Sequence, residues 1–261
     1  MSYRLITLYS GSSGNSTLVS TGNTSILIDA GKSARTLCNA LNSVGSDIRN
    51  ISAIFITHEH SDHISALETI SKKYGIPIHM TEQSAKKLDR YSDSSVQSCL
   101  VRHNVLFEEK VGDMTVTSFR TPHDSLMSVG YRIEFSDENG DHALGVATDI
   151  GHVTKDITDG LSGCEAVVLE SNHDEQMLED GPYPYYLKLR IRSSKGHLSN
   201  SDSACLASTL AENGTRGFIL AHLSRENNLP ELAYDEAHSA ISDPSVKIRI
   251  AHPDEPVELE V

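Results

Sequence analysis

The sequence predicts an α/β fold in which two β-sheets pack face to face and helices cover the outer faces. Two similar halves indicate this arrangement, since each begins with several short strand patterns and continues with alternating helices and strands. The 261 residues contain no long linker, low-complexity segment or sequence repeat. We therefore expect one compact domain over residues 1–261.

In the first half, short apolar runs are separated by Gly, Ser and Asn turns, which favour strands. A helix is expected to begin with Ser61 as its N-cap, to run to Tyr74 and to stop at Gly75. The other expected elements are strands at 3–10, 16–20, 25–31, 51–57 and 76–80, and helices at 33–45 and 82–91.

The second half returns to strands, and the turn "DENGD" joins two of them. Helical patterns then alternate with apolar runs, as in units that build a parallel sheet. The expected strands are at 113–121, 129–136, 142–150, 165–171, 217–224, 246–253 and 256–261, and the expected helices are at 199–214 and 231–242.

Composition limits the functional classes. With 36 acidic and 22 basic residues the formal charge is -14, which argues against nonspecific binding to a membrane or a nucleic acid unless bound cations reverse the charge locally. The N-terminal residues lack the pattern of a signal peptide, and no apolar run approaches the roughly 20 residues of a membrane span. We expect a cytoplasmic protein with reduced thiols, at Cys38, Cys99, Cys164 and Cys205.

The segment "THEHSDH" follows the apolar run 51–57 directly and holds three histidines and an aspartate. His58 and His60 are two residues apart, so in extended chain they point to the same side, and Asp62 and His63 fall where the chain turns back. Imidazole and carboxylate groups are ligands for zinc, manganese or iron. The alternative is a solvated loop in which the histidines have no common role.

Three more ligand-type residues follow apolar strands in the same way. His123 comes after residues 113–121, Asp149 lies at the end of 142–150, and His222 lies at the end of the apolar part of 217–224. Side chains at the ends of such strands converge at one edge of the sheets, so these residues can join the histidine-rich turn. A lone histidine at such a position is more often structural, but three such positions beside this turn favour a metal site.

The motifs also resemble a known family. "THEHSDH" matches the THxHxDH signature of the metallo-β-lactamase fold, and "YSGSSGNSTLVS", "YPYYLKLRI" and "GHLSN" resemble its bacterial YycJ/WalJ (VicX) branch over the whole chain. The resemblance implies a four-layer αββα sandwich with two metal ions at one edge. It implies that His58, His60 and His123 hold the first ion, that Asp62, His63 and His222 hold the second, and that Asp149 bridges them.

The same resemblance implies residues that contact the ligands and orient them. Asp29, in "ILIDAG", would orient ligand side chains, and we expect Thr57 and His173 to do the same. Nitrogen and oxygen ligands leave zinc, manganese and iron open, and manganese is the expectation within this family.

Two metal ions about 3.5–4 Å apart suit the displacement at a phosphodiester. We expect Asp62 to orient the attacking hydroxide as well as to bind metal. In "GHLSN", His197 and Ser199 precede a helix start, where phosphate is favoured, and His197 could protonate the leaving oxygen. The alternative is an ordinary capped helix with a surface histidine.

Several residues are candidates for holding phosphate. Asn15 lies in the Ser/Gly-rich "SGSSGNS", which could equally be a tight hairpin connection. A sparse set of basic residues surrounds His197 and His222 and could form a groove along a nucleic acid, or merely a solvated helix face. These residues are Lys188, Arg190, Arg192, Lys195 and Arg225.

These observations predict a metal-dependent phosphodiesterase. The family resemblance points to DNA, to exonuclease action from a 5′ end and to a role in repair. One alternative is a small-molecule hydrolase such as a cyclic phosphodiesterase, a lactonase or a thioesterase, which the acidic charge favours modestly. A second alternative is a regulatory protein whose metal is structural. The oligomeric state stays open.

Overall fold

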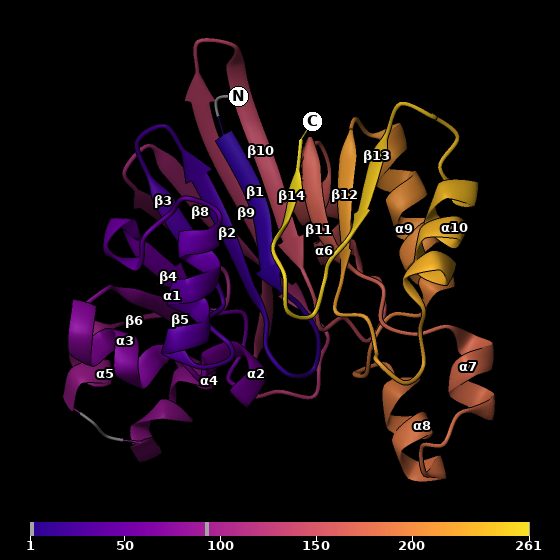
Figure 1. Ribbon diagram of the computed structural model, residues 1–261, viewed down its shortest axis with the longest axis horizontal. Helices are drawn as coiled ribbons and strands as arrows, with labels where there is room; N and C mark the ends of the chain where they lie inside the picture. The colour runs from indigo at the N-terminus through magenta and orange to yellow at the C-terminus, as the bar shows by residue number, and fades with distance from the viewer. Residues whose placement is uncertain (1–2, 92–93, 261) are drawn as a thin grey trace.

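Two seven-stranded sheets pack face to face in the structure, a computed structural model that describes residues 3–91 and 94–260 (Figure 1). One buried cluster between the sheets contains side chains of both, including Ile28 and Phe55 from the first sheet and Tyr131, Val168 and Ile219 from the second. The predicted face-to-face pairing of sheets is confirmed.

The first sheet combines an antiparallel part with a parallel part. Strands β14, β1, β2 and β3 pair antiparallel, and β3, β4, β5 and β6 pair parallel. In spatial order the strands are β14 (Val257–Leu259), β1 (Tyr3–Tyr9), β2 (Ser16–Thr21), β3 (Ser25–Ile28), β4 (Ala53–Phe55), β5 (Ile78–Thr81) and β6 (Leu100–His103).

The second sheet is built in the same way. Strands β10, β11, β12 and β13 pair parallel, and β7, β8, β9 and β10 pair antiparallel. In spatial order they are β13 (Lys247–Ile250), β12 (Gly217–Ala221), β11 (Ala166–Glu170), β10 (Gly140–Ala147), β9 (Ser128–Asp137), β8 (Met114–Thr121) and β7 (Glu108–Val111).

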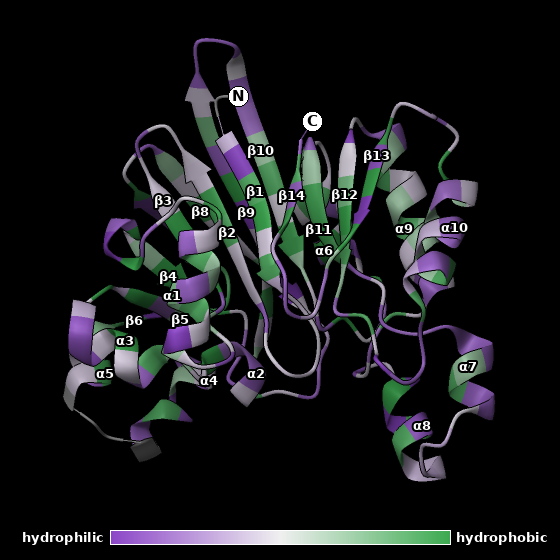
Figure 2. Cartoon of the chain, in the orientation of Figure 1, coloured by the Kyte–Doolittle hydropathy of each residue, from purple (hydrophilic) through white to green (hydrophobic). Residues whose placement is uncertain are grey.

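Helices cover both outer faces, and their apolar sides point inward (Figure 2). On the first sheet these include α1 (Ala34–Ser43) and α3 (Leu67–Tyr74), and on the second α6 (Lys155–Leu161), α9 (Asn200–Glu212) and α10 (Pro230–Ala240). The resulting four layers are the predicted αββα sandwich. The shorter elements are η1 (Ile48–Asn50), α2 (Ser61–Ile64), α4 (Glu82–Ala85), η2 (Leu88–Tyr91), α5 (Ser94–Cys99), α7 (Glu175–Asp180) and α8 (Tyr185–Ile191).

The prediction of one continuous helix from Ser61 to Tyr74 is wrong. This segment is divided into α2 and α3, and His60 rather than Ser61 is the N-cap residue of α2. The helix is interrupted because Ala30 bonds to both sides of the break: its N–H donates to His63 O at 2.8 Å, and its carbonyl accepts from Ala66 N at 2.9 Å.

Other differences are smaller. The predicted strand 25–31 ends at Ile28, because Asp29 takes a positive φ of 64°. The predicted helix 82–91 is divided between α4 and η2. Strands β6 and β7 and helices α5 to α8 were not predicted. The final residue of the predicted strand 256–261 lies outside the described residues. No helix among the described residues is long and apolar enough to cross a membrane.

Candidate metal centre

The histidine-rich turn is fixed to the loop after β3 by one buried carboxylate. Because β3 and β4 are parallel neighbours, their carboxyl ends lie side by side. Asp29 accepts hydrogen bonds from the backbone N of Thr57 at 2.8 Å and from its hydroxyl at 2.9 Å. The other contact of Asp29, 2.8 Å to Nδ1 of His63, leaves Nε2 of His63 facing the centre. Asp29 and Thr57 therefore lie against His63, and their supporting role stays a prediction.

Three histidines form the first of two ligand clusters. Nitrogen atoms of His58, His60 and His123 lie within 4.8 Å of one another. His58 is fully buried, and its ring centroid lies 4.5 Å from that of His60 and 5.0 Å from that of His123. The structure thus joins the first two histidines of the THxHxDH turn to a histidine that follows β8.

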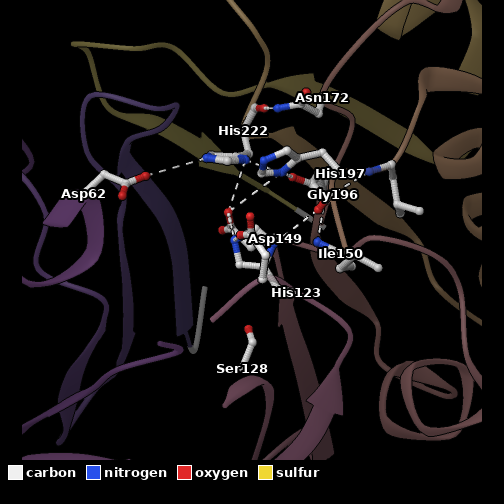
Figure 3. Close-up of polar contacts among 12 residues, drawn as sticks. Asp62, His123, Ser128, Asp149, Ile150, Asn172, Gly196, His197 and His222 are labelled. Carbon is white, nitrogen blue, oxygen red and sulfur yellow. Dashed lines mark hydrogen bonds and ion pairs between the residues drawn. The ribbon is translucent and has the colours of Figure 1, made fainter. Parts of the chain in front are cut away.

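The second cluster unites the two sheets in the same way. Asp62 and His63 come from the turn and α2, His222 follows β12, and their ligand atoms again lie within 4.8 Å of one another. Figure 3 shows Asp62 and His222 pointing toward each other, with 3.9 Å between Oδ2 and Nε2.

Asp149 lies between the clusters. Its Oδ2 atom is 3.3 Å from Nε2 of His63, and its Oδ1 atom is 3.6 Å from Nε2 of His123 and 3.7 Å from Nδ1 of His222. The side chain is 3% exposed. Oδ2 thus lies on the side of the second cluster and Oδ1 lies near histidines of both clusters, and the bridging role of Asp149 stays a prediction.

Three of these residues have strained backbones. Asp29, Asp149 and His222 have φ values of 64°, 58° and 59°, in the left-handed region that non-glycine residues rarely adopt. Each follows the end of a parallel strand, so the left-handed residue turns the chain sharply at the edge of the sheet. Such a conformation costs on the order of 1–3 kcal/mol and is found mainly at functional sites.

Glu170 is a buried part of the centre that the site prediction missed. Its Oε1 atom lies 2.8 Å from Nδ1 of His197 and 2.8 Å from Nδ1 of His222, and Oε2 accepts from Ile150 N at 2.7 Å. Glu170 lies at the carboxyl end of the apolar strand 165–171. Asp149 and His222 were predicted from the same kind of position. Burial alone would raise the pKa of Glu170, but the two histidines lower it to about 2.

The donor set fits divalent metal ions. Nε2 of His58, Oδ2 of Asp149 and Nε2 of His222 are buried and have no hydrogen-bond partner in the described part of the chain. Unsatisfied buried polar atoms are rare in proteins, and a metal would satisfy these three. The ligands carry nitrogen and oxygen but no sulfur, which suits zinc, manganese or iron.

The protonation of the histidines differs across the centre. Burial lowers the pKa of His58 and of His123, so both are neutral, as metal ligands must be. Burial would also raise the pKa of Asp62, but His222 and His63 hold it well below its usual range. Asp62 is therefore an ionised carboxylate at the open side of the cluster.

His197 belongs to neither triplet, but its ligand atom and those of Asp149, Glu170 and His222 lie within 4.8 Å of one another. Its ring centroid is 5.1 Å from that of His222 and 5.2 Å from that of His123, and its side chain is 20% exposed (Figure 3). Its Nδ1 atom is held by Glu170, so Nε2 is the atom available to a substrate.

Asn15, Ser199 and His173 have different environments. The Asn15 amide nitrogen lies 3.2 Å from Nε2 of His63 and 3.5 Å from Oδ2 of Asp62, so it contacts the second cluster directly. Ser199 is the N-cap of α9, as predicted, and its hydroxyl accepts from Asp202 N. His173 is buried beside Ser199, and burial lowers its pKa to about 4.

The predicted basic residues have different partners. Arg190, 58% exposed, is paired through Nε with Asp124, the residue after His123. Lys188 donates to the backbone carbonyl of Glu179, on α7, and Arg192 pairs with the carboxylate of the same residue. Arg225 lies 3.4 Å from the Ser13 hydroxyl, beside the Ser/Gly-rich loop.

Comparisons with known proteins agree with this geometry. A family model described as a β-lactamase superfamily domain matches residues 24–223. The chain is 34% identical over 226 residues to the exodeoxyribonuclease YycJ of Bacillus anthracis, covering 87% of this chain and 84% of the relative. It is 33% identical over 231 residues to the exodeoxyribonuclease WalJ of Streptococcus pneumoniae, with the same coverage.

Solved structures share the fold at low sequence identity. The metallo-β-lactamase fold protein YhfI of Bacillus subtilis superposes with a TM-score of 0.74 at 16% identity, over 99% of this chain and 100% of that one. The short form of human tRNase Z superposes with a TM-score of 0.66 at 16% identity, over 98% and 100% of the two chains.

Proposed function

Because this chain belongs to the YycJ/WalJ family of the β-lactamase superfamily and is a hydrolase of the metallo-β-lactamase fold, we propose that it is a metal-dependent exodeoxyribonuclease. The observation that carries the proposal is the meeting of seven ligand-type side chains from both sheets in two clusters joined by Asp149.

The two clusters give each ion its own set of ligands. His58, His60 and His123 would hold the first ion and Asp62, His63 and His222 the second, with Asp149 shared. When bound, two divalent ions lower the pKa of water and stabilise the charge that develops on phosphoryl oxygens. Manganese is the ion we propose first, with zinc and iron as the other candidates that this donor set accepts.

The chain's own residues position the substrate and move the proton. Asp62 is ionised and partly exposed, so it can accept a hydrogen bond from the attacking water and orient it. His197 presents Nε2 on the other side of the centre, where it can donate a proton to the leaving oxygen. Glu170 fixes the ring of His197 for this step.

We propose DNA as the substrate because both curated relatives carry the name exodeoxyribonuclease at 33–34% identity. Action from a 5′ end, a role in repair and a cytoplasmic location belong to the same proposal. Arg190 is the residue we favour for contact with the phosphate backbone. Asn15, Ser199, Lys188, Arg192 and Arg225 stay predicted contacts.

The proposal is tested with manganese-loaded protein and end-labelled single- and double-stranded DNA and RNA, alongside a thioester and a lactone. We expect mononucleotides released from the 5′ end of DNA. Turnover of the thioester or lactone alone would contradict the proposal and favour a small-molecule hydrolase. No turnover with one tightly held ion per chain would favour a structural metal in a regulatory protein.

Two variants separate the assigned roles. Asp62→Asn should lower turnover by orders of magnitude, because the ionised acceptor is lost while the shape is kept. His197→Ala should slow turnover by about 10²–10⁴-fold, the usual contribution of a general acid. The metal content of His197→Ala should stay that of the unaltered protein, and a fall in metal content would assign His197 to the ligands instead.

A further inference from the structure

A cavity of about 530 Å³ opens beside the candidate metal centre, on the side of the first sheet. His60 and Asp62 form part of its wall, so the cavity adjoins both ligand clusters. Its volume lies within the range of about 300–1,000 Å³ that is usual for sites of small ligands. None of the roles proposed above uses this space.

The lining has an apolar part and an acidic part. Ile64, Leu67, Leu88 and Val96 provide the apolar surface. Glu59 and Glu68 provide carboxylates, and Lys87 and Arg190 add two cations to the lining. A nucleobase has apolar faces and an edge with amino groups that donate hydrogen bonds, so it suits both parts. A phosphate would meet the carboxylates as well as Lys87 and Arg190, so the apolar part of the wall is what favours a base.

Glu59 adds a specific reason for a donor-bearing ligand. Its side chain is buried, and Oε1 accepts from the backbone N of Leu126 at 2.8 Å. Its other oxygen, Oε2, is buried and has no hydrogen-bond partner in the described part of the chain. The cavity is therefore lined by a carboxylate that has one satisfied oxygen and one buried oxygen without a partner in the described part of the chain.

Arg190 connects this cavity to the reacting centre. It lines the 530 Å³ cavity and also a second cavity of about 170 Å³ whose walls include His197 and His222. Asp124 holds one edge of the guanidinium, and the side chain remains 58% exposed. A cation between two cavities that flank the centre is placed to contact the backbone phosphate of a strand that passes from one to the other.

We propose that the larger cavity takes the base of the nucleotide next to the scissile phosphate, with Arg190 against the backbone phosphate. This inference rests on the proposed phosphodiesterase function and assigns a base-binding site to it. The cavity then supplies binding energy at the chain end being removed, and a sugar phosphate without a base lacks that energy.

Binding to the metal-loaded protein is the direct test. Calorimetry compares deoxyadenosine 5′-monophosphate with deoxyribose 5-phosphate, which carries the same phosphate and no base. We expect the nucleotide to bind at least about tenfold more tightly, which corresponds to about 1.4 kcal/mol. Equal affinities would overturn the proposal.

Two substitutions near each other in the chain provide the matched control. Ser65 lines the cavity, whereas Thr69 is an exposed residue of α3 that lines a different cavity. Ser65→Leu should fill part of the cavity and bring the ratio of the two affinities, nucleotide over sugar phosphate, close to one. Thr69→Leu should keep it. An equal effect of the two substitutions would contradict a base in this cavity.

Kinetics distinguish this inference from the function on which it rests. An oligonucleotide with an abasic site in place of its terminal nucleotide should be cleaved with at least about a tenfold lower kcat/KM than the intact one. Equal kcat/KM for both would overturn the base site and leave the nuclease intact. Cleavage of neither substrate would count against the nuclease function. The calorimetric comparison would then decide whether the cavity binds a base.

Discussion

Glu170 is the residue that links the two histidines on the second sheet's side of the centre. A single oxygen atom of this carboxylate lies 2.8 Å from Nδ1 of both His197 and His222. One histidine is assigned to the leaving oxygen and the other to a metal ion. The orientation of the acid and of a ligand therefore depends on the same side chain.

Glu170→Gln keeps the shape and removes the charge. We expect metal affinity and turnover to fall by about 10–100-fold, as when partners of metal-bound histidines are lost. Metal titration and kcat measure the effect. Glu165→Gln is the control, because Glu165 holds Nδ1 of His142 at 2.7 Å outside the centre. Equal losses in the two variants, or none in Glu170→Gln, would contradict the assigned role.

Metal binding should release protons. Burial alone would lower the pKa of His222, but Asp149, Asp62 and Glu170 raise it well above its ordinary value, and Asp29 and Asp149 do the same for His63. Without metal both histidines are protonated at neutral pH, and a metal ion must displace those protons.

The affinity for metal should therefore rise with pH up to these raised pKa values and fall in acid. Calorimetry in buffers of different ionisation enthalpy measures the number of protons released, and we expect more than one per chain. An affinity that does not change from mildly acidic to neutral pH, with no buffer dependence, would be the contrary result.

The loop after β3 and the histidine-rich turn form one packed element. Gly31 donates to Asn15 O at 2.9 Å, and Asn15 donates to Asp62 O at 2.8 Å. A Cβ atom on Gly31 would stand 1.9 Å from that same Asp62 oxygen and 2.6 Å from Asn15 N. Only glycine lets the two loops approach so closely.

Gly31→Ala should force Asp62 and its neighbours away from the second cluster. We expect a loss of about 1–3 kcal/mol in the free energy of unfolding, as for other overpacked sites, together with weaker metal binding. Gly22→Ala, where a Cβ would meet no atom within 4 Å, is the control for both measurements. Unchanged stability and metal affinity in Gly31→Ala would show that the loops can separate without consequence.

Element by element, local patterns in the sequence predicted most strands and the candidate ligands near their ends. His123, Asp149 and His222 were found because a polar residue directly after a buried strand is a local signal. The break between α2 and α3 was not found, because it arises from hydrogen bonds to Ala30, which is distant in the sequence. Glu170 carried the same signal as Asp149, but its contact with two histidines depends on how three strands align.

At the scale of the whole molecule, the candidate centre joins the two sheets at one edge. The turn after β4 belongs to the first sheet, and the loops after β8, β10 and β12 belong to the second. We infer a single domain, because one buried cluster also contains side chains of both sheets.

Removing the metal should therefore destabilise the entire fold. A ligand at 100 times its dissociation constant stabilises the native state by about 2.7 kcal/mol. Scanning calorimetry should show a lower Tm after chelation and its recovery when manganese is added back. A Tm that is the same with and without metal would mean that the ions do not connect the sheets.

The central claim is that seven side chains from two sheets hold a pair of metal ions. Diffraction from manganese-loaded crystals, recorded at the absorption edge of the metal, tests it most directly. We predict two anomalous peaks about 3.5–4 Å apart, one among His58, His60 and His123 and the other among Asp62, His63 and His222, with Asp149 between them. A single peak, or peaks outside these clusters, would contradict the account.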